Sequence, residues 1–284
     1  MKSVLITGAK GQLGQSIKKI RSEFTDVALH FFDSNSLDIT QQEDVTNIFD
    51  EIRPDYCINC AAFTAVDLAE TKKEQARAIN ETGVKNLAEA CKDNGSTLIH
   101  ISTDYVFDGS KDTPYIEEDK VSAVNFYGKT KLEGERIVKE TLEKYFIIRT
   151  SWLYSEFGHN FVKTMLRLGK ERESLKVVND QHGSPTYAPD LAKAIAKMIN
   201  SGSDSYGIFH FCNKGVTTWY HFAVEIFRLK KMDVKVSPIS SELFPTAAKR
   251  SNYSALDSSK FESTFEFKIP KWTESLAKML PLLS

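Results

Sequence analysis

The chain has 284 residues, and 41% of them are hydrophobic, which suits one large α/β domain with a smaller partner. Its 37 Lys and Arg nearly balance its 38 Asp and Glu, leaving a formal net charge of −1 and arguing against nucleic acid as a partner. No apolar run approaches the ~18 residues of a membrane span, and the N-terminus lacks a signal-peptide core, so we expect a cytoplasmic protein without membrane contact.

The first predicted elements are a strand at 3–7, a glycine loop and a helix at 16–20. The loop contains Gly8, Gly11 and Gly14, each three residues from the next. Between a buried strand and a helix, such glycines let the backbone approach a pyrophosphate at the helix N-terminus. The spacing is a variant of G-x-G-x-x-G, so an ordinary glycine-rich turn remains the alternative.

A second predicted strand, 27–32, is followed by Asp33. This acid lies about 20 residues beyond the last glycine of the loop, where an acid holds the ribose of a dinucleotide. An exposed aspartate at a strand end is also common without any such role. Asp33 is therefore a candidate with an open alternative.

Helices and strands alternate up to about residue 150. Helix patterns cover 41–52 (with Thr40 as N-cap), 67–93 and 124–143, and strand patterns cover 55–61, 97–102 and 145–149. This order predicts a Rossmann-type, doubly wound parallel sheet for a dinucleotide-binding domain at 1–150.

The pattern loosens after Ser151. Helices are predicted at 160–172, 189–200, 217–229 and 272–280, and strands at 175–178 and 207–212. We expect 151–284 to form mainly a smaller, mixed α/β substrate-binding domain, with some segments returning to the first domain. The gradual join predicts that the two parts pack tightly.

The cysteines and histidines do not indicate redox or metal chemistry. Cys57 and Cys60 have the spacing of a redox pair, but they fall within the predicted strand 55–61. Residues three apart on a strand face opposite sides of the sheet, which favours buried thiols. The six histidines have no ligand spacing, so we predict no metal site.

Two further candidate segments follow predicted strands. Ala61 and Ala62 are small enough for a flat ring to lie against the strand edge, although helix packing explains them almost equally well. Thr103 falls at the carboxyl end of the strand 97–102, where ligands bind in open α/β sheets. A hydroxyl there can polarise a substrate oxygen, whereas a lone threonine is more often a cap or turn residue.

Tyr127 and Lys131 lie four residues apart, on one face of the predicted helix 124–143. A nearby cation makes a phenolate easier to form, so this pair can deliver a proton to a carbonyl oxygen while a hydride reaches its carbon. The spacing alone is weak evidence because chance also produces it. Together with Thr103 and the glycine loop, it predicts a catalytic set.

Trp152 follows the strand 145–149, where the predicted domains meet. A cleft between domains at a strand's carboxyl end commonly binds a small ligand, and an indole offers a flat apolar face and one N–H donor. The alternative is a tryptophan wedged in the domain interface.

These motifs together resemble the extended short-chain dehydrogenase/reductase family. The matching segments are 7–14, 61–70, 102–109 and 127–131 in the first half, and 149–152, 160–165 and 179–186 in the second. The second-half segments resemble the branch that reduces nucleotide-linked keto sugars. One departure is Arg250-Ser251, where the family usually has Arg-Pro, which puts the local backbone and the role of Arg250 in doubt.

The resemblance implies reduction of the 4-keto group of dTDP-4-dehydro-β-L-rhamnose to dTDP-β-L-rhamnose, with NADPH or NADH, for bacterial surface polysaccharide. Tyr127 would donate the proton, Lys131 would lower its pKa and bind the nicotinamide ribose, and Thr103 would orient the pair. Implied cofactor contacts are Gly8, Gly11, Gln12, Leu13, Gly14, Asp33, Asp38, Ile39, Ala62, Phe63, Thr64, Tyr127 and Lys131. Implied substrate contacts are Thr103, Asp104 and Trp152.

Three other functions remain as alternatives. A nucleotide-sugar epimerase or dehydratase could use the same scaffold, but a dehydratase would have a glutamate after Asp104, where this chain has Tyr105. A non-catalytic regulatory subunit resembling that of methionine adenosyltransferase would not need Thr103, Tyr127 and Lys131 together. A structural or redox-sensing NAD-binding module would not need Trp152 or the segment 179–186.

The sequence leaves several properties open. Asp33 favours NADH by repelling a 2′-phosphate, whereas Lys10 would attract one. The oligomeric state is likewise open, with a homodimer as one option, and metal dependence cannot be read from the sequence.

Overall fold

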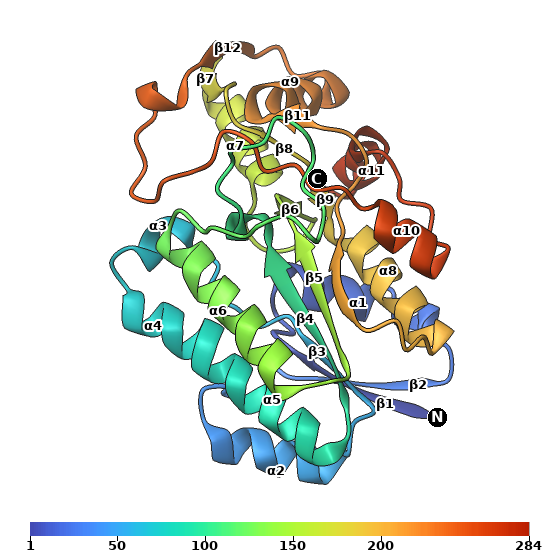
Figure 1. The fold of residues 1–284 in the computed structure, drawn as a ribbon. Helices are drawn as coiled ribbons and strands as arrows, with labels where there is room; N and C mark the ends of the chain where they lie inside the picture. The colour runs from blue at the N-terminus through green and yellow to red at the C-terminus, as the bar shows by residue number, and fades with distance from the viewer. Residues whose placement is uncertain (284) are drawn as a thin grey trace.

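A six-stranded parallel sheet forms the centre of the computed structural model, which describes residues 1–283 (Figure 1). In the order β10-β5-β4-β3-β1-β2, the strands are Gly207–His210, Tyr145–Thr150, Thr97–Thr103, Tyr56–Asn59, Lys2–Thr7 and Val27–Phe31. One face packs against α1 (Gln12–Lys19), α8 (Ala188–Ser201) and α10 (Ser259–Phe265), and the other against α2 (Gln42–Ile52), α5 (Gly83–Asn94) and α6 (Phe126–Thr141). The predicted fold class is confirmed.

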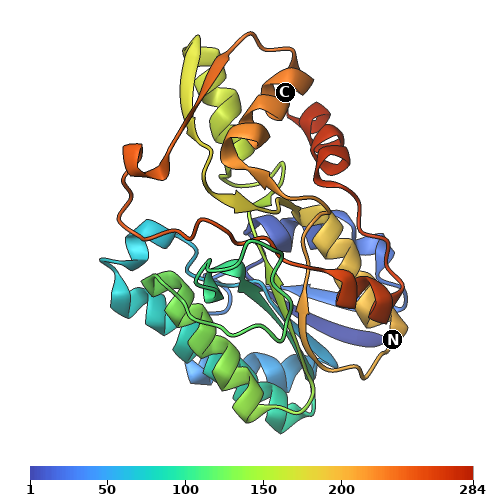
Figure 2. The ribbon, with the colours of Figure 1, turned by 45° about the horizontal axis from the view of Figure 1, so that its top comes forward.

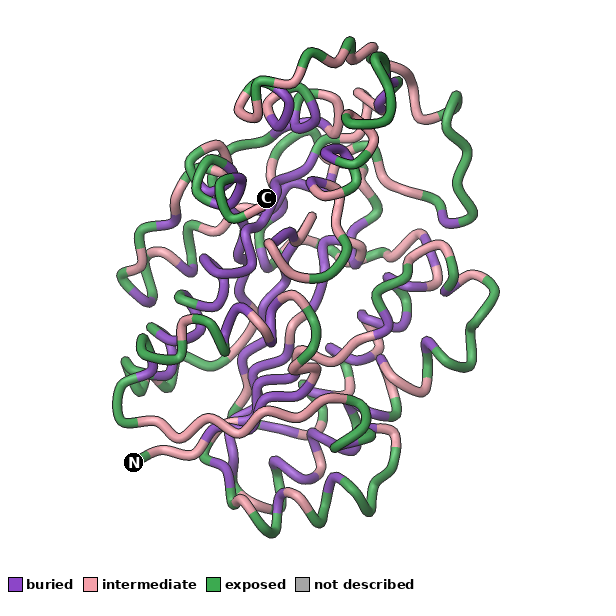
Figure 3. The backbone as a smooth tube through the Cα atoms, turned by 180° about the vertical axis from the view of Figure 1, so that it is seen from behind, coloured by how far each residue is buried: buried purple, intermediate pink, exposed green. Residues whose placement is uncertain are grey.

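The central strands are buried on both faces, as Figure 3 shows by their purple colour. In β1, Ile6 packs with the α1 and α8 side, whereas Leu5 packs with the α2 and α5 side. Cys57 lies on the Leu5 side and Cys60 on the Ile6 side, so the prediction that they face opposite ways is confirmed. Both cysteines are free. The interpretation as buried thiols is confirmed for Cys57, whereas Cys60 is part-buried and lines the cavity described below.

The second half of the chain adds shorter elements above the sheet (Figure 1). They are β6 (Leu153–Tyr154), α7 (Phe161–Glu171), β7 (Ser174–Val178), β8 (His182–Gly183), β9 (Thr186–Tyr187), β11 (Thr217–Thr218), α9 (Trp219–Lys230), β12 (Lys235–Ile239) and α11 (Trp272–Met279). Short helical turns are η1 (Arg21–Glu23), η3 (Asp104–Val106), η4 (Ser241–Leu243) and η5 (Leu280–Leu282). The four helices predicted here are present within two residues at each end. The two-residue strands, β12 and α10 were not predicted, because segments this short or this irregular carry little periodic signal.

Parts of the second half complete the core of the first. Strand β10 pairs with β5 at the sheet edge, ending at His210 rather than at the predicted residue 212. Apolar residues of α8 and α10 join the same core cluster as α1. The division into domains at residue 150 stays a prediction, but the main sheet already draws on both sides of it.

Two predicted boundaries are wrong. Gln41 rather than Thr40 caps α2, and the Thr40 hydroxyl instead donates to Asp38 Oδ1 at 2.8 Å. The predicted continuous helix 67–93 is divided into α3 (Val66–Ala69), α4 (Lys73–Arg77), a π-helical turn η2 (Ala78–Thr82) and α5. The π turn coincides with contacts of Asn80 to the Phe63 backbone and to Thr130 of α6. Helix periodicity in the sequence cannot reveal such contacts.

Two smaller boundary shifts bear on the site. Strand β3 ends at Asn59, earlier than predicted, so residues 60 and 61 belong to the loop that follows. Helix α1 begins at Gln12, earlier than predicted, so the last glycine of the loop lies inside its first turn. Within the described residues, none of the helices combines the length and apolar character needed to cross a bilayer.

Candidate active site

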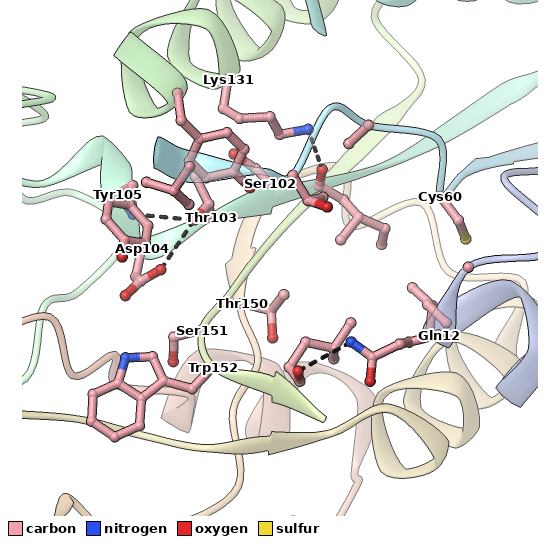
Figure 4. Close-up of a pocket in the computed structure, with 18 of the residues that line it drawn as sticks. Gln12, Cys60, Ser102, Thr103, Asp104, Tyr105, Lys131, Thr150, Ser151 and Trp152 are labelled. Atoms are coloured by element: carbon pink, nitrogen blue, oxygen red, sulfur yellow. Dashed lines mark hydrogen bonds between the residues drawn. The ribbon is translucent and has the colours of Figure 1, made fainter. Parts of the chain in front are cut away.

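A cavity of about 560 Å³ opens at the carboxyl ends of β1, β3, β4 and β5 (Figure 4). The chain leaves β1 toward β2 on one side, while β3 lies on the other, and such a reversal of strand order leaves a crevice. Predicted site residues that line the cavity are Gly11, Gln12, Leu13, Ala62, Thr64, Thr103, Asp104, Tyr127, Lys131 and Trp152. The fold therefore brings ten of the predicted residues, from five segments of the chain, into one place.

The glycine loop allows α1 to begin close behind β1. Gly8 has φ +64°, and a Cβ there would lie 2.7 Å from the backbone of Cys60. A Cβ at Gly14 would lie 2.5 Å from the carbonyl oxygen of Gly8. These two glycines thus permit close packing, while Gly11, Gln12 and Leu13 face the cavity. Gly11 is the N-cap of α1, and among the described residues no side chain caps it, which leaves the first-turn N–H groups suited to an anion.

The glycine loop also contacts the second half of the chain through Gln12. Its side-chain amide donates to the Leu153 carbonyl at 3.3 Å, as Figure 4 shows, and accepts from Ser155 and Asn160 at 3.0 Å each. Asn160 also caps α7 by accepting from the Lys163 N–H. Gln12 therefore fixes the loop relative to the segment that follows β5.

Six residues predicted to bind cofactor lie outside the cavity lining, namely the packing glycines Gly8 and Gly14 and the four residues Asp33, Asp38, Ile39 and Phe63. Asp33 pairs with Lys10 at 2.5 Å just beyond β2, and this contact lowers the pKa of the Asp33 carboxyl. Asp38 is exposed, Ile39 is buried beneath Gly83, and Phe63 packs in a small apolar cluster. Their roles in cofactor binding remain predictions.

The loop after β3 is held by Asn80, which the sequence analysis did not identify. Its side chain exchanges two hydrogen bonds with the Phe63 backbone, at 2.9 and 3.2 Å, and donates to the Thr130 hydroxyl at 3.0 Å. Asn80 lies in the π turn η2, and a Cβ on Gly134 of α6 would approach its carbonyl oxygen to 2.6 Å. The π turn thus lies where Asn80 packs closely against α6. Through its bonds to Phe63, Asn80 links the loop that carries Ala62 and Thr64 to this helix.

Thr103 ends β4 and directs its hydroxyl toward the turn η3. The hydroxyl donates to Asp104 Oδ1 at 3.0 Å and accepts from the Tyr105 N–H at 3.2 Å (Figure 4). Thr103 is therefore the N-cap of η3, so the alternative noted from the sequence is correct, and it lines the cavity as well. Burial raises the pKa of Asp104 to about 6, although hydrogen bonds from Ser254 and Thr103 oppose the rise.

Helix α6 places Tyr127 beside this turn. Asn125 caps the helix by accepting from the Gly128 N–H at 2.8 Å. A Cβ on Gly128 would lie 2.2 Å from the Tyr105 carbonyl oxygen, so only glycine lets α6 approach so closely. Burial raises the pKa of the Tyr127 phenol, and a hydrogen bond with Thr103 opposes this. The phenol is therefore protonated at neutral pH.

Lys131 lies one helical turn beyond Tyr127 and is only 2% exposed. Its ammonium donates to the Ile101 carbonyl at 2.7 Å, the dashed line at the top of Figure 4. Burial lowers the pKa of Lys131 to about 8, against the favourable effect of Glu135. The side chain thus titrates much closer to neutral pH than an exposed lysine.

A buried ion pair lies behind these residues. Arg149 on β5 donates to both carboxylate oxygens of Glu135, at 2.9 and 2.8 Å, and both side chains are 2% exposed. Ser102 also donates to Glu135, at 2.5 Å. The sequence signal was an arginine inside the apolar strand 145–149, which the sequence analysis used only for the family resemblance.

Trp152 forms the wall opposite Thr103 and Asp104 (Figure 4). Its indole stacks on Trp219 with centroids 3.5 Å apart, and a Cβ at Gly183 would lie 2.6 Å from the ring. Its backbone has φ +45°, which is uncommon for a residue other than glycine. Trp152 therefore combines both interpretations of the sequence, since it packs between elements and lines the cavity. Trp219 was not identified from the sequence.

Arg250 closes one side of the site. It pairs with Asp67 through two hydrogen bonds, at 2.7 and 3.1 Å. Burial lowers the pKa of Arg250, but the Asp67 carboxylate and the nearby Tyr105 more than offset this and raise it. The segment around it runs down from β12 beside α3, in red-orange in Figure 2. The neighbouring Ser251, the departure from the family pattern, faces Gly109, where a Cβ would lie 2.3 Å from its own.

A second, larger hollow adjoins the first. It has a volume of about 860 Å³ and shares Trp219, Gln181 and Arg250 with a small pocket that also includes Trp152 and Asp104. Its apolar lining comes mainly from α7, β7 and the segment after β12. Its cationic lining residues are Arg172, Lys176, Lys235 and Arg250. The small pocket shares lining residues with both hollows and therefore lies between them.

The chain is similar to several characterised proteins along nearly its whole length. The family model described as the RmlD substrate binding domain matches residues 1–284. A dTDP-4-dehydrorhamnose reductase from Aggregatibacter actinomycetemcomitans is 41% identical over 286 residues, which cover 97% of each chain.

Solved structures agree with these likenesses. The crystal structure of a dTDP-4-dehydrorhamnose reductase from Clostridium acetobutylicum has a TM-score of 0.94 and 47% identity, covering 99% of both chains. That of a dTDP-4-dehydrorhamnose reductase from Bacillus anthracis, in complex with NADP, also has a TM-score of 0.94, at 43% identity, covering 99% of this chain and 100% of the other.

Proposed function

The chain belongs to the RmlD substrate binding domain family, and on this premise we propose that it reduces the 4-keto group of dTDP-4-dehydro-β-L-rhamnose to give dTDP-β-L-rhamnose. It is an NAD(P)H-dependent oxidoreductase of nucleotide-sugar biosynthesis. The observation that carries the proposal is the meeting of Tyr127, Lys131 and Thr103 with the glycine loop in one cavity.

The site fits a nicotinamide dinucleotide. The uncapped N-terminus of α1 suits the pyrophosphate, and the close packing at Gly8 and Gly14 lets the backbone come near it. The loop after β3, which Asn80 holds in place, contributes Ala62 and Thr64 to the cavity and suits the middle of the cofactor. Lys131 suits the nicotinamide ribose. A reduced nicotinamide bound there supplies the hydride.

Tyr127 delivers the proton to the substrate oxygen. Its burial keeps the phenol protonated until charge develops on that oxygen. An alkoxide is far more basic than a phenolate, so the transfer runs toward the product. The Lys131 ammonium then stabilises the phenolate that is left, and Thr103, which lines the same cavity, orients the Tyr127 hydroxyl.

Asp104 and Trp152 bind the sugar between the two walls of the cavity. With a pKa of about 6, Asp104 is mostly a carboxylate at neutral pH and accepts a hydrogen bond from a sugar hydroxyl. Trp152 offers the edge and face left free by Trp219 to the deoxysugar ring. These contacts orient the keto carbon toward Tyr127.

The larger hollow accepts the nucleotide part of the substrate. Its apolar lining suits the flat base, and Arg172, Lys176, Lys235 and Arg250 suit the diphosphate. Because the small pocket beside Trp152 shares Gln181, Trp219 and Arg250 with this hollow, a substrate with its sugar at Asp104 would have its base near β7.

The test is turnover of dTDP-4-dehydrorhamnose with NADPH and NADH in turn, following the loss of nicotinamide absorbance and identifying the product by NMR. We expect stoichiometric oxidation of the cofactor and a dTDP-rhamnose product. Binding of cofactor and sugar nucleotide without oxidation would instead favour a regulatory subunit, and interconversion of nucleotide sugars without net oxidation would favour an epimerase.

A further inference from the structure

A chain of four buried polar side chains runs behind the cavity, from β1 to α6. The Thr7 hydroxyl donates to Asn59 Oδ1 at 2.7 Å, and Asn59 Nδ2 lies 3.2 Å from His100 Nδ1. On its other side, His100 Nε2 lies 3.4 Å from Lys131 Nζ. All four side chains are at most 2% exposed, so water does not compete for these contacts. The proposed mechanism uses only Lys131 among them.

The Asn59 amide can be oriented in only one way. Its Oδ1 accepts from the Thr7 hydroxyl and from the Ala61 backbone N–H at 3.1 Å, and the same N–H is shared with the Thr7 oxygen at 3.2 Å. A backbone N–H only donates, so the atom facing it must be the amide oxygen. The Asn59 NH₂ group is therefore turned toward His100 and donates to its Nδ1.

This orientation fixes the tautomer of His100. Complete burial lowers the pKa of His100 well below its usual value, and the Lys131 charge lowers it further, so the ring is neutral. A neutral imidazole has one N–H, and because Nδ1 accepts from Asn59, the hydrogen is on Nε2. That hydrogen lies on the side of Lys131.

We propose that His100 is a positioning residue for Lys131, and that its Nε2–H favours the uncharged amine of Lys131 in the cofactor-free protein. An ammonium has three donors and no acceptor, so it meets the imidazole N–H as one donor against another. The amine has a lone pair that accepts this N–H, and it can still donate to the Ile101 carbonyl. The histidine thereby makes the ammonium easier to deprotonate.

The other groups near Lys131 do not cancel this effect. Glu135, one turn along α6, favours the ammonium, but Arg149 and Ser102 already bind its carboxylate. Tyr127, one turn earlier, is an uncharged phenol beside Asp104. Burial lowers the pKa of Lys131 to about 8 against the effect of Glu135, and the His100 N–H acts in the same direction as burial.

A catalytic consequence follows, and it rests on the proposed function. Lys131 must be charged to stabilise the Tyr127 phenolate, so loss of its proton limits the reaction at high pH. Because the folded-state pKa is about 8, kcat/KM for the keto sugar should fall as pH rises through that value.

The first test measures the tautomer directly, by ¹⁵N NMR of the cofactor-free protein labelled at histidine, with His100 assigned by substituting each of the other five histidines in turn. We expect a protonated Nε2 and an unprotonated Nδ1. A hydrogen on Nδ1 would overturn the proposal. This measurement needs no turnover and no variant of His100, so it is independent of whether the reductase activity is found.

The second test compares His100→Gln with His210→Gln as the matched control. A glutamine at 100 can turn its oxygen toward Lys131 and accept from the ammonium, whereas His210 is an equally buried histidine on β10 that contacts Arg149 and the Tyr115 carbonyl. We expect the NMR titration midpoint of Lys131, assigned with Lys131→Met, to rise by about one pH unit in His100→Gln only. The high-pH limit of kcat/KM should rise with it.

Equal midpoints in the wild type and His100→Gln, or equal shifts in both variants, would contradict the proposal. If His100→Gln does not fold, the tautomer in the wild-type protein decides the question.

Discussion

The two walls of the cavity are built differently. On the sheet side, Thr103, Tyr127 and Lys131 are each less than 9% exposed, and hydrogen bonds to the backbone hold Thr103 and Lys131. On the facing side, Trp152 and Trp219 are half-buried and stack on each other. Proton transfer requires fixed distances, and the sheet wall provides them, while the facing wall offers apolar surface for binding. Changes to the sheet wall should therefore affect stability or turnover, and changes to the facing wall should affect substrate affinity.

The largest effect, on the free energy of unfolding, is expected for Glu135→Gln, which removes the buried ion pair with Arg149 behind the sheet wall. It leaves the Arg149 charge buried without its carboxylate, and loss of one partner of a buried pair costs about 3–5 kcal/mol of unfolding free energy. Chemical denaturation measures this. The control is Glu140→Gln on the same helix, whose exposed pair with Arg136 should contribute less than about 1 kcal/mol. Similar losses for both variants would show that burial does not distinguish the two pairs.

The next largest effect is expected for Tyr127→Phe, which removes the proton donor and keeps the ring. We expect turnover to fall by at least ~100-fold, about 2.7 kcal/mol of activation free energy, with cofactor affinity nearly intact. Steady-state kinetics and cofactor titration measure the two quantities. Tyr145→Phe, at the amino end of β5, is the control and should keep wild-type turnover. Unchanged turnover in Tyr127→Phe would remove this residue from the mechanism.

A smaller effect is expected on the facing wall, for Trp152→Phe. The Michaelis constant for the sugar nucleotide should rise by about 10-fold, equal to ~1.4 kcal/mol of binding, because the smaller ring loses contact area and the N–H donor. The constant for the cofactor and the melting temperature should change little, since a phenyl ring can still stack on Trp219.

Trp272→Phe makes the same exchange outside the cavity, where the indole packs against Phe222. It should leave both Michaelis constants unchanged. A large drop in melting temperature for Trp152→Phe without a change in substrate affinity would identify Trp152 as a packing residue only.

The smallest effect is expected for Asp33→Ala, away from both walls. Removing the carboxylate frees Lys10 and abolishes repulsion of a 2′-phosphate, so the ratio of kcat/KM for NADPH over NADH should rise several-fold. Asp44→Ala, which removes an exposed charge from α2, should leave the ratio unchanged. A constant ratio in Asp33→Ala would mean that Asp33 does not face the cofactor ribose.

Much of the sheet wall could be read from the sequence, because its signals are local. An apolar strand followed by Gly8, or by Thr103, predicts a residue at the carboxyl edge of a parallel sheet, and the spacing of Tyr127 and Lys131 predicts one helix face. Fewer residues of the facing wall could be predicted from the sequence. Trp152 was identified, but Trp219 and the Asp67–Arg250 pair depend on segments that are distant in the chain and carry no common period.

The sequence by itself determined the doubly wound fold, the positions of the main strands along the chain and the residue types at their ends, since periodicity and turn residues act over a few positions. Only the tertiary structure decided how α6 approaches η3 at Gly128, how the π turn at Asn80 fits against α6, and which way the Asn59 amide and the His100 ring point. These features depend on atoms from different strands and helices meeting within hydrogen-bond distance. No local pattern encodes such a meeting, because each partner is chosen by the packing of the whole sheet and its helices.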